Sequence, residues 1–179
     1  MNDRYISEIE SIRTVNFYTL IEFYVLYLLG ETGVQTQKVI KAHMELSKML
    51  DAKYPFAQKE ILMNINTDGR KVYFNFHSSF LPLDGTKQLN LGFINQFFKN
   101  LEFDQALLAS KFWPMGKKNS IVLDPKRQLG QPVINETNIQ PQVLFTLFKG
   151  GESIPFIAYL YDLDEKSVKG AIDFCNSAA

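Results

Sequence analysis

The sequence predicts an α+β protein, in which an N-terminal helical pair packs with a small antiparallel sheet and a C-terminal bundle of three short helices follows. Apolar residues recur at helical spacing over residues 16–51 and again over 139–175, whereas residues 71–79 alternate as a strand does. Because strands this short need a helix against them, we expect a sheet built from residues 61–83 and 101–123 to pack on the first helical region. The three-helix unit is expected to stand as a separate lobe.

The first helix is expected to begin after Asn16, a suitable N-cap, and to run through residues 17–29. Its apolar stripe consists of Phe17, Leu20, Ile21, Tyr24 and Leu28, and its remaining faces are apolar too. A helix that is apolar nearly all round must be buried nearly all round. We therefore expect a homodimer in which this helix contributes to the interface. Residues 1–14 are polar and are interpreted as a tail or as the remnant of a linker.

A second helix is expected from about residue 35 to residue 51, with a lysine-rich face that we interpret as solvated. Pro55 ends this helical pair. The elements expected next are a turn at 66–69, strands at 71–79 and 80–83 with a turn at 84–85, a helix at 91–101, an extended stretch at 101–114 and a strand at 120–123.

The last third of the chain carries start and stop signals for three helices joined by tight turns. Pro141 suits the first turn of a helix because its fixed φ fits there, and Gly150-Gly151 is expected to end that helix. Ser153 is a suitable N-cap for the second helix and Asp164 for the third. This arrangement is typical of a helix-turn-helix unit, which indicates binding or regulation rather than metabolism.

Charge and composition narrow the class of protein. Nineteen basic and nineteen acidic side chains cancel, so no overall field attracts the chain to nucleic acid or anionic lipid. The N-terminus has no signal-peptide core, and the apolar run 17–29 is too short to span a bilayer and contains Glu22. The single cysteine, Cys175, excludes an internal disulfide. We expect a soluble, cytoplasmic protein, whose fifteen Phe and eight Tyr fit either an interface or a Phe-rich core.

The sequence contains no catalytic or metal-binding motif. His43 and His77 lie on different predicted elements and are interpreted as structural. Asp162, Asp164 and Glu165 are close together, but a turn and an N-cap account for them, because acidic residues suit a helix N-terminus. We expect no enzyme activity, no cofactor, no bound metal and no small-molecule substrate.

The third C-terminal helix is the candidate DNA-binding element. Lys166, Ser167 and Lys169 lie in its N-terminal half, from which a recognition helix contacts bases and phosphates. From Ile139 onward, however, three lysines face five acidic residues, and phosphate neutralisation supplies most non-specific affinity. Weak DNA binding and a pure docking role both remain open. Gly170 in mid-helix indicates close packing at that point.

A second cationic segment precedes the three helices. Lys117, Lys118 and Arg127 lie close together along the chain, near Trp113. Such residues suit an acidic partner or a phosphate, but they equally suit a solvated linker. The sequence leaves both interpretations open.

The stretch from Ser120 to Phe174 resembles the domain-of-unknown-function 433 family, whose members carry an Asp-Pro and a Pro-Val-Ile opening before a three-helix, homeodomain-like bundle. The matching residues are Asp124, Pro125, Gly130, Pro132, Val133, Ile134, Thr137, Ile139, Gly151, Glu152, Ile157, Ala158, Leu163, Val168 and Ala171. Residues 17–57 and the stretch LEFD through FWPMG also resemble longer members, the VapB-type antitoxins. The chain departs from them in two ways: Glu136 replaces a glycine, and no room exists before Phe17 for the MerR-like helix-turn-helix of longer relatives.

The resemblance implies an antitoxin-like regulatory protein of a type II toxin–antitoxin system, which binds a PIN-like ribonuclease toxin and operator DNA. Clustered carboxylates of such a toxin hold Mg²⁺ or Mn²⁺, so a cation or an apolar plug over the cleft would block it. The candidate cations are Lys117, Lys118 and Arg127, and exposed aromatic residues are the candidates for the apolar plug. We expect residues 1–116 to serve interaction and dimerisation and 117–179 to form the helix-turn-helix domain. The alternative is a protein–protein adaptor that does not bind DNA and docks through the same helices.

Overall fold

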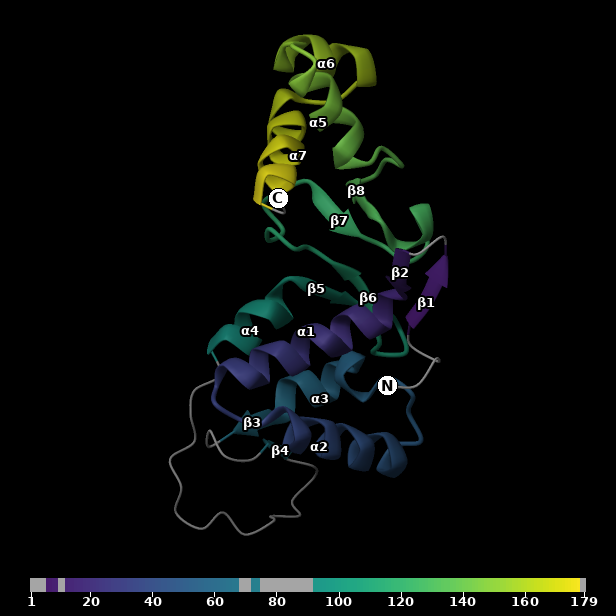
Figure 1. The fold of residues 1–179 in the computed structure, drawn as a ribbon, viewed down its shortest axis with the longest axis vertical. Helices are drawn as coiled ribbons and strands as arrows, with labels where there is room; N and C mark the ends of the chain where they lie inside the picture. Colours follow the sequence, from purple (N-terminus) through teal and green to yellow (C-terminus); the bar gives the residue numbers. More distant parts are fainter. Residues whose placement is uncertain (1–5, 10–11, 68–71, 75–91, 178–179) are drawn as a thin grey trace. The chain divides into compact units, whose positions relative to one another are not determined.

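The computed structural model describes residues 6–9, 12–67, 72–74 and 92–177. The chain forms two compact units, Met1–Lys99 with Phe103–Ala109 and Asn100–Glu102 with Ser110–Ala179. Within the described ranges, seven α-helices and several short strands make the protein α+β, as predicted (Figure 1). The boundary predicted near residue 116 lies inside the second unit, and the division of roles that it marks stays a prediction.

The first unit combines helices with two antiparallel hairpins, β1 with β2 and β3 with β4. Its described elements are β1 (Ile6–Ile9), β2 (Ile12–Val15), α1 (Phe17–Glu31), α2 (Thr36–Met49), the 3-10 turn η1 (Pro55–Ala57), α3 (Lys59–Asn64), β3 (Ile65–Thr67), β4 (Val72–Phe74) and α4 (Gly92–Lys99).

Helix α1 begins where the sequence predicts. The side chain of Asn16 accepts a hydrogen bond from the N–H of Thr19 at 2.9 Å, which satisfies a donor that the first helical turn leaves open. Ile21, Val25 and Leu29 follow at intervals of four residues and are completely buried. The spacing places them on one face of the helix, and this face joins the core of the first unit.

The predicted apolar stripe of α1 is partly wrong. Tyr24 and Tyr27 are exposed, whereas the charged Glu22 is buried. The ring of Tyr24 lies 4.6 Å from that of Phe97 on α4, measured between centroids, so a partly exposed tyrosine still packs on its own chain. Burial on every face of α1 is therefore not observed within the single chain, and the homodimer stays a prediction.

Other expectations for this unit also need correction. Residues 6–9 and 12–15 form an antiparallel hairpin rather than a tail, with Ile6 paired with Val15 and Ile9 with Ile12 along the backbone. Both segments contain β-branched residues, which favour strands. Residues 61–64 are helical, since Ile61 and Leu62 turn into the core from α3. β3 and β4 form a sheet of their own instead of joining the later strands.

Helix α2 and strand β4 are confirmed. Lys38, Lys41, Lys48 and Lys53 are exposed, as a solvated face requires. β4 lies within the predicted strand at 71–79, and α4 covers most of the helix predicted at 91–101. The rest of that strand, including His77, and the predictions at 80–85 lie outside the described residues.

The second unit contains most of a four-stranded sheet, in the order β5-β6-β7-β8. β5 (Leu101–Phe103) and β6 (Ala109–Phe112) hold residues of both units, and they are followed by β7 (Ile121–Leu123), the 3-10 turn η2 (Gln128–Gly130), β8 (Pro132–Ile134), α5 (Pro141–Lys149), α6 (Ile154–Tyr161) and α7 (Glu165–Ser177). β7 pairs antiparallel with both β6 and β8. The sequence did not predict β8.

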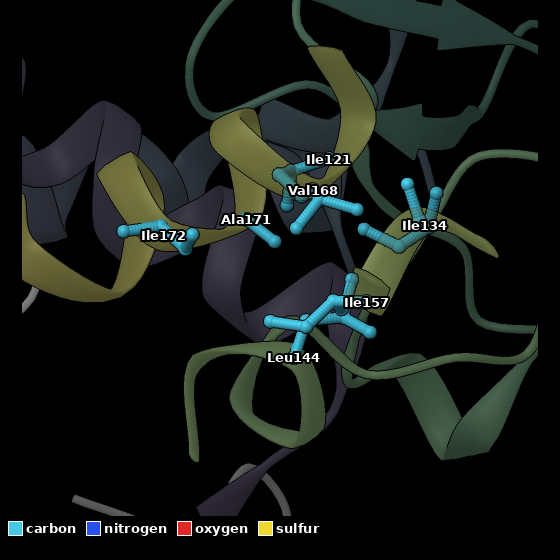
Figure 2. Packing of buried hydrophobic residues seen from close by; sticks show 8 residues of the cluster. Ile121, Ile134, Leu144, Ile157, Val168, Ala171 and Ile172 are labelled. Carbon is cyan, nitrogen blue, oxygen red and sulfur yellow. The ribbon is translucent and has the colours of Figure 1, made fainter. Parts of the chain in front are cut away.

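Side chains from β7, β8 and the last three helices converge on one core (Figure 2). Ile121 and Ile134 come from the strands, and Leu144, Ile157 and Val168 come from α5, α6 and α7. The prediction that the three helices stand as a separate lobe is therefore wrong. Three short helices leave one apolar side uncovered, and the two strands cover it.

The start and stop signals of these helices are confirmed. Pro141 opens α5, and Ser153 caps α6 by accepting from the Phe156 N–H. Gly151 has a φ of +99° after the end of α5, and the N–H groups of Gly151 and Glu152 donate to the carbonyls of the last helical turn, as in a Schellman motif. None of the described helices is long and apolar enough to cross a membrane.

Candidate functional sites

The first turns of α7 present the two lysines predicted to contact DNA. Lys166 and Lys169 are both exposed on this helix. The helix begins at its predicted cap, because the carboxylate of Asp164 accepts from the Ser167 N–H. Hydrogen bonds from Ser167 hold the pKa of the Asp164 carboxyl below its ordinary value of 3.8. Asp164 therefore stays ionised near the same helix end as the lysines.

Ser167 is not placed as the sequence predicts for a DNA contact. It is only 8% exposed, and its hydroxyl lies 2.8 Å from that of Ser120. Gly170 one turn later packs against Asn119, whose Oδ1 atom would lie 3.1 Å from a Cβ at that position. This side of α7 rests on the segment before β7, which leaves the lysine side for a partner.

The three predicted cations lie on both sides of strand β7. Lys117 and Lys118 precede β7 and are exposed, whereas Arg127 follows it. The Arg127 guanidinium lies 3.8 Å from the buried Asp124 carboxylate and donates to the Thr137 carbonyl at 3.3 Å. Arg127 therefore holds two loops together, and the lysines remain the candidate partner contacts.

The motif around Thr137 has a structural role. The Thr137 hydroxyl donates to the Ile134 carbonyl and accepts from the Ile139 N–H, at 2.9 and 3.1 Å. Glu136 has a φ of +63°, so the turn keeps the left-handed conformation that suits the glycine of the family. Glu136 adopts this conformation although its Cβ makes the left-handed region sterically unfavourable.

The loop after β7 exposes a leucine that the sequence analysis missed. Leu129 is 100% exposed and has a φ of +55°, and its neighbours Gln128 and Gly130 also have positive φ values, 44° and 83°. The left-handed region costs a residue with a Cβ roughly 1–2 kcal/mol. Strained residues of this kind gather at functional sites. A strained leucine fully in solvent is a candidate contact for a protein partner.

Helix α6 presents a second apolar surface. Phe156, Tyr159 and Leu160 are all exposed on this helix, while Ile157 and Ala158 are buried in the core. Exposed apolar side chains that gather in one place are typical of interaction sites. These residues include the exposed aromatics that the sequence analysis expected.

The first unit pairs two polar residues that the sequence analysis did not connect, the buried Glu22 and the partly buried His43. The Nε2 atom of His43 on α2 lies 2.6 Å from Oε2 of Glu22 on α1. The other carboxylate oxygen of Glu22 accepts from the Phe56 N–H at 2.9 Å, and the Phe56 ring lies edge-on to His43. The pair joins α1, α2 and η1. His43 is structural as predicted, but its partner is a carboxylate inside the unit.

Burial raises the pKa of the Glu22 carboxyl above its ordinary value of 4.5, although His43 and the N–H groups of Phe56 and Ala57 act in the opposite direction. Glu22 is thus a perturbed acid in a wall of apolar residues. In the ranges that the structure describes, no group of three or more His, Cys, Asp or Glu side chains is placed to hold a metal ion.

Comparisons with known proteins confirm the resemblance over the C-terminal part. Residues 121–175 match the model of a family described as "Protein of unknown function (DUF433)". The crystal structure of Rv2018 from Mycobacterium tuberculosis is similar in fold, with a TM-score of 0.64 and 17% sequence identity, over 90% of this chain and 79% of that chain. No curated protein matches the sequence.

Proposed function

We propose that the protein is an antitoxin-like regulator of a type II toxin–antitoxin system, which binds a PIN-like ribonuclease toxin and, together with it, operator DNA. A cytoplasmic location belongs to this proposal. The observation that carries it is Leu129, a strained and fully exposed apolar side chain within the residues that match the family. Such a side chain gains free energy when it enters an apolar pocket of a protein partner.

The toxin contact is proposed to combine an apolar plug with cations. Leu129 is the plug, and the exposed Lys117 and Lys118 are the charges that steer an acidic cleft toward it. Arg127 supports the loop from within through Asp124 and Thr137. The rigid support keeps the entropic cost of ordering the loop on binding low.

For the DNA contact, we propose that α5, α6 and α7 form a homeodomain-like helix-turn-helix with α7 as the recognition helix. Lys166 and Lys169 would contact phosphates or base edges, and Ser167 would orient the helix through Ser120. Acidic residues surround the two lysines, so one copy is expected to bind weakly. A homodimer or a toxin complex that presents two copies would raise the affinity through effective concentration.

Leu129→Gly is expected to weaken toxin binding and to stabilise the protein. Loss of a central apolar anchor raises the Kd roughly 30-fold, which corresponds to about 2 kcal/mol. Glycine tolerates positive φ, so the free energy of unfolding should rise by up to about 1 kcal/mol. Calorimetric titration against the product of the adjacent gene measures the first effect, and chemical denaturation measures the second.

Glu136→Gly is the matched control for this variant. Glu136 is also exposed and also has a positive φ, so the change removes similar strain in the same unit. We expect comparable stabilisation and unchanged toxin binding. Equal binding by both variants would remove Leu129 from the interface, and an adjacent gene product that is neither toxic nor bound would overturn the antitoxin proposal.

Lys166→Ala combined with Lys169→Ala is expected to weaken operator binding by the complex and to leave toxin neutralisation intact. Each lost phosphate contact should lower the slope of log K against log salt by about 0.9. Electrophoretic mobility shifts with DNA from upstream of the gene, at several salt concentrations, measure this slope. A slope that the double variant does not change would show that α7 does not face the phosphates.

The exposed face of α6 favours a second candidate function, a protein–protein adaptor that does not bind DNA. Phe156, Tyr159 and Leu160 are apolar and exposed on a helix of the same bundle, as a docking helix requires. The mobility shifts separate the two functions. An adaptor would bind its partner with full affinity and show no salt-dependent DNA binding in any complex.

A further inference from the structure

Helix α6 is apolar on both of its faces. Its sequence, IPFIAYLY, contains no charged residue. The residues that pack on the core of the second unit are Ile154, Ile157, Ala158 and Tyr161, and Ile157 points into that core in Figure 2. The four remaining residues lie on the opposite side of the helix and are all exposed: Pro155, Phe156, Tyr159 and Leu160. We call them the outer face of α6.

The outer face is too apolar to be an ordinary helix surface. Tyr159 is 85% exposed, Leu160 53% and Phe156 46%, and their spacing makes them neighbours on the helix. Single exposed apolar residues are common, but apolar residues that adjoin one another mark interaction sites. A helix that is apolar all round is normally buried all round. We therefore expect the outer face to be covered by a protein surface.

The two ends of α6 differ in charge. The residues that follow the helix expose three acids and one lysine, a net charge of −2: Asp162, Asp164, Glu165 and Lys166. Before the helix, the exposed Lys149 and Glu152 cancel, and the N–H groups of the first turn form the positive end of the helix dipole. A second α6 in the antiparallel direction would place each acidic end beside a positive dipole end. A parallel pair would bring the two acidic ends together.

We propose that a second copy of this chain covers the outer face of α6, with the two helices antiparallel about a twofold axis. The same patch then serves on both copies, and Phe156 of each copy meets Tyr159 of the other. Aromatic pairs of this kind stabilise an interface beyond the area they bury. A helix of eight residues is only about 12 Å long. The interface is therefore smaller than the roughly 800 Å² per partner of a stable dimer, and the dimer forms only at high protein concentration.

This assignment moves the expected homodimer from α1 to the second unit. Helix α7 follows α6 after a short turn (Figure 1). A twofold axis through α6 would thus present Lys166 and Lys169 from two copies at once. The arrangement would support the DNA contact proposed above, but it does not rest on that contact, because the interface needs neither DNA nor toxin.

Sedimentation equilibrium of the full chain, from low to high micromolar concentration, tests the interface. We expect the natural chain to show a monomer–dimer equilibrium. Tyr159→Glu should raise the Kd of the dimer roughly 10-fold or more, because it buries a charge against Phe156 of the second copy. Tyr27→Glu is the matched control, since it makes the same change at a tyrosine on α1 that is 58% exposed, and it should leave the Kd unchanged. A natural chain that stays monomeric, or a Kd that Tyr159→Glu does not raise, would overturn the proposal.

Two oppositely charged double variants identify the occupant as a second copy. One carries Phe156→Glu with Tyr159→Glu, and the other carries Phe156→Lys with Tyr159→Lys. Like charges face each other in a dimer of either variant, so each variant alone should stay monomeric. An equimolar mixture should form a dimer that added salt weakens. A mixture that stays monomeric, or a single variant that dimerises as strongly as the natural chain, would contradict the pairing of α6 with α6 and would leave the outer face to a different protein.

Discussion

Truncating Leu144 to Ala is expected to lower the free energy of unfolding of the second unit by about 3 kcal/mol, within the 2–5 kcal/mol typical of buried leucines. Leu144 is completely buried on α5 and faces Ile121 and Ile134 from the strands and Ile157 and Val168 from the other helices (Figure 2). Because these neighbours come from four other elements, no single movement can fill the space. The fluorescence of Trp113, the single tryptophan and a buried residue of this unit, reports the transition in denaturant.

Leu160→Ala is the matched control. It makes the same chemical change on the neighbouring helix α6, where Leu160 is 53% exposed. A loss of no more than about 0.5 kcal/mol is expected at this surface position. Similar losses at both positions would show that α5 does not pack over the strands as described.

Local signals made the C-terminal helices predictable. Pro141, Gly151, Ser153 and Asp164 each act within a few residues of their own position, through a fixed φ, a positive φ or a capping hydrogen bond. Their physics does not depend on the rest of the fold. Helix boundaries in this region therefore followed from the sequence, and so did the resemblance of residues 121–175 to a known family.

Long-range pairings could not be predicted in the same way. Strand β8 has three residues, too few to show an alternation, and it exists because β7 lies beside it. Serine is mostly exposed in proteins, but the hydroxyl of Ser167 contacts that of Ser120, which lies 47 positions earlier in the chain. Glu22 was interpreted as a charge that interrupts an apolar run, whereas His43 and Phe56 give it partners inside the unit.

The candidate sites show the same division between features that local signals predict and features that depend on the folded chain. The exposure of Lys166 and Lys169 was predicted correctly, because the charged lysine side chain is rarely buried. Leu129 could not be found, since exposure and a positive φ are properties of the folded backbone, and a leucine in sequence suggests the core. A pocket lined by residues of α1, α2 and η1 could not be predicted from the sequence either, because it forms only where two helices and a turn meet.

Glu22→Ala is expected to destabilise the first unit by about 3 kcal/mol. The change removes the carboxylate that accepts from the Phe56 N–H and contacts His43, and loss of a buried partner costs roughly 1–3 kcal/mol for a neutral group and 3–5 kcal/mol for a charged one. Native-state hydrogen exchange of the α1 amides measures the loss. Exchange in α5–α7 of the second unit serves as an internal reference and should not change.

Glu22→Gln separates hydrogen bonding from charge at the same position. The glutamine oxygen can still accept from Phe56, so this variant should lose less free energy of unfolding than the alanine variant.

The pH dependence of the Glu22→Gln variant carries the sharper test. Burial raises the pKa of the Glu22 carboxyl above 4.5, so the unfolded chain releases this proton at a lower pH than the folded protein does. The contribution of this group is therefore fully present below pH 4.5 and is lost as the pH rises through the folded-state pKa. Glutamine has no such proton, so the variant should gain stability relative to the natural protein as the pH rises from 4.5 toward neutrality. If the natural protein instead became more stable relative to the variant as the pH rises, the pair with His43 would outweigh burial and hold the carboxyl ionised.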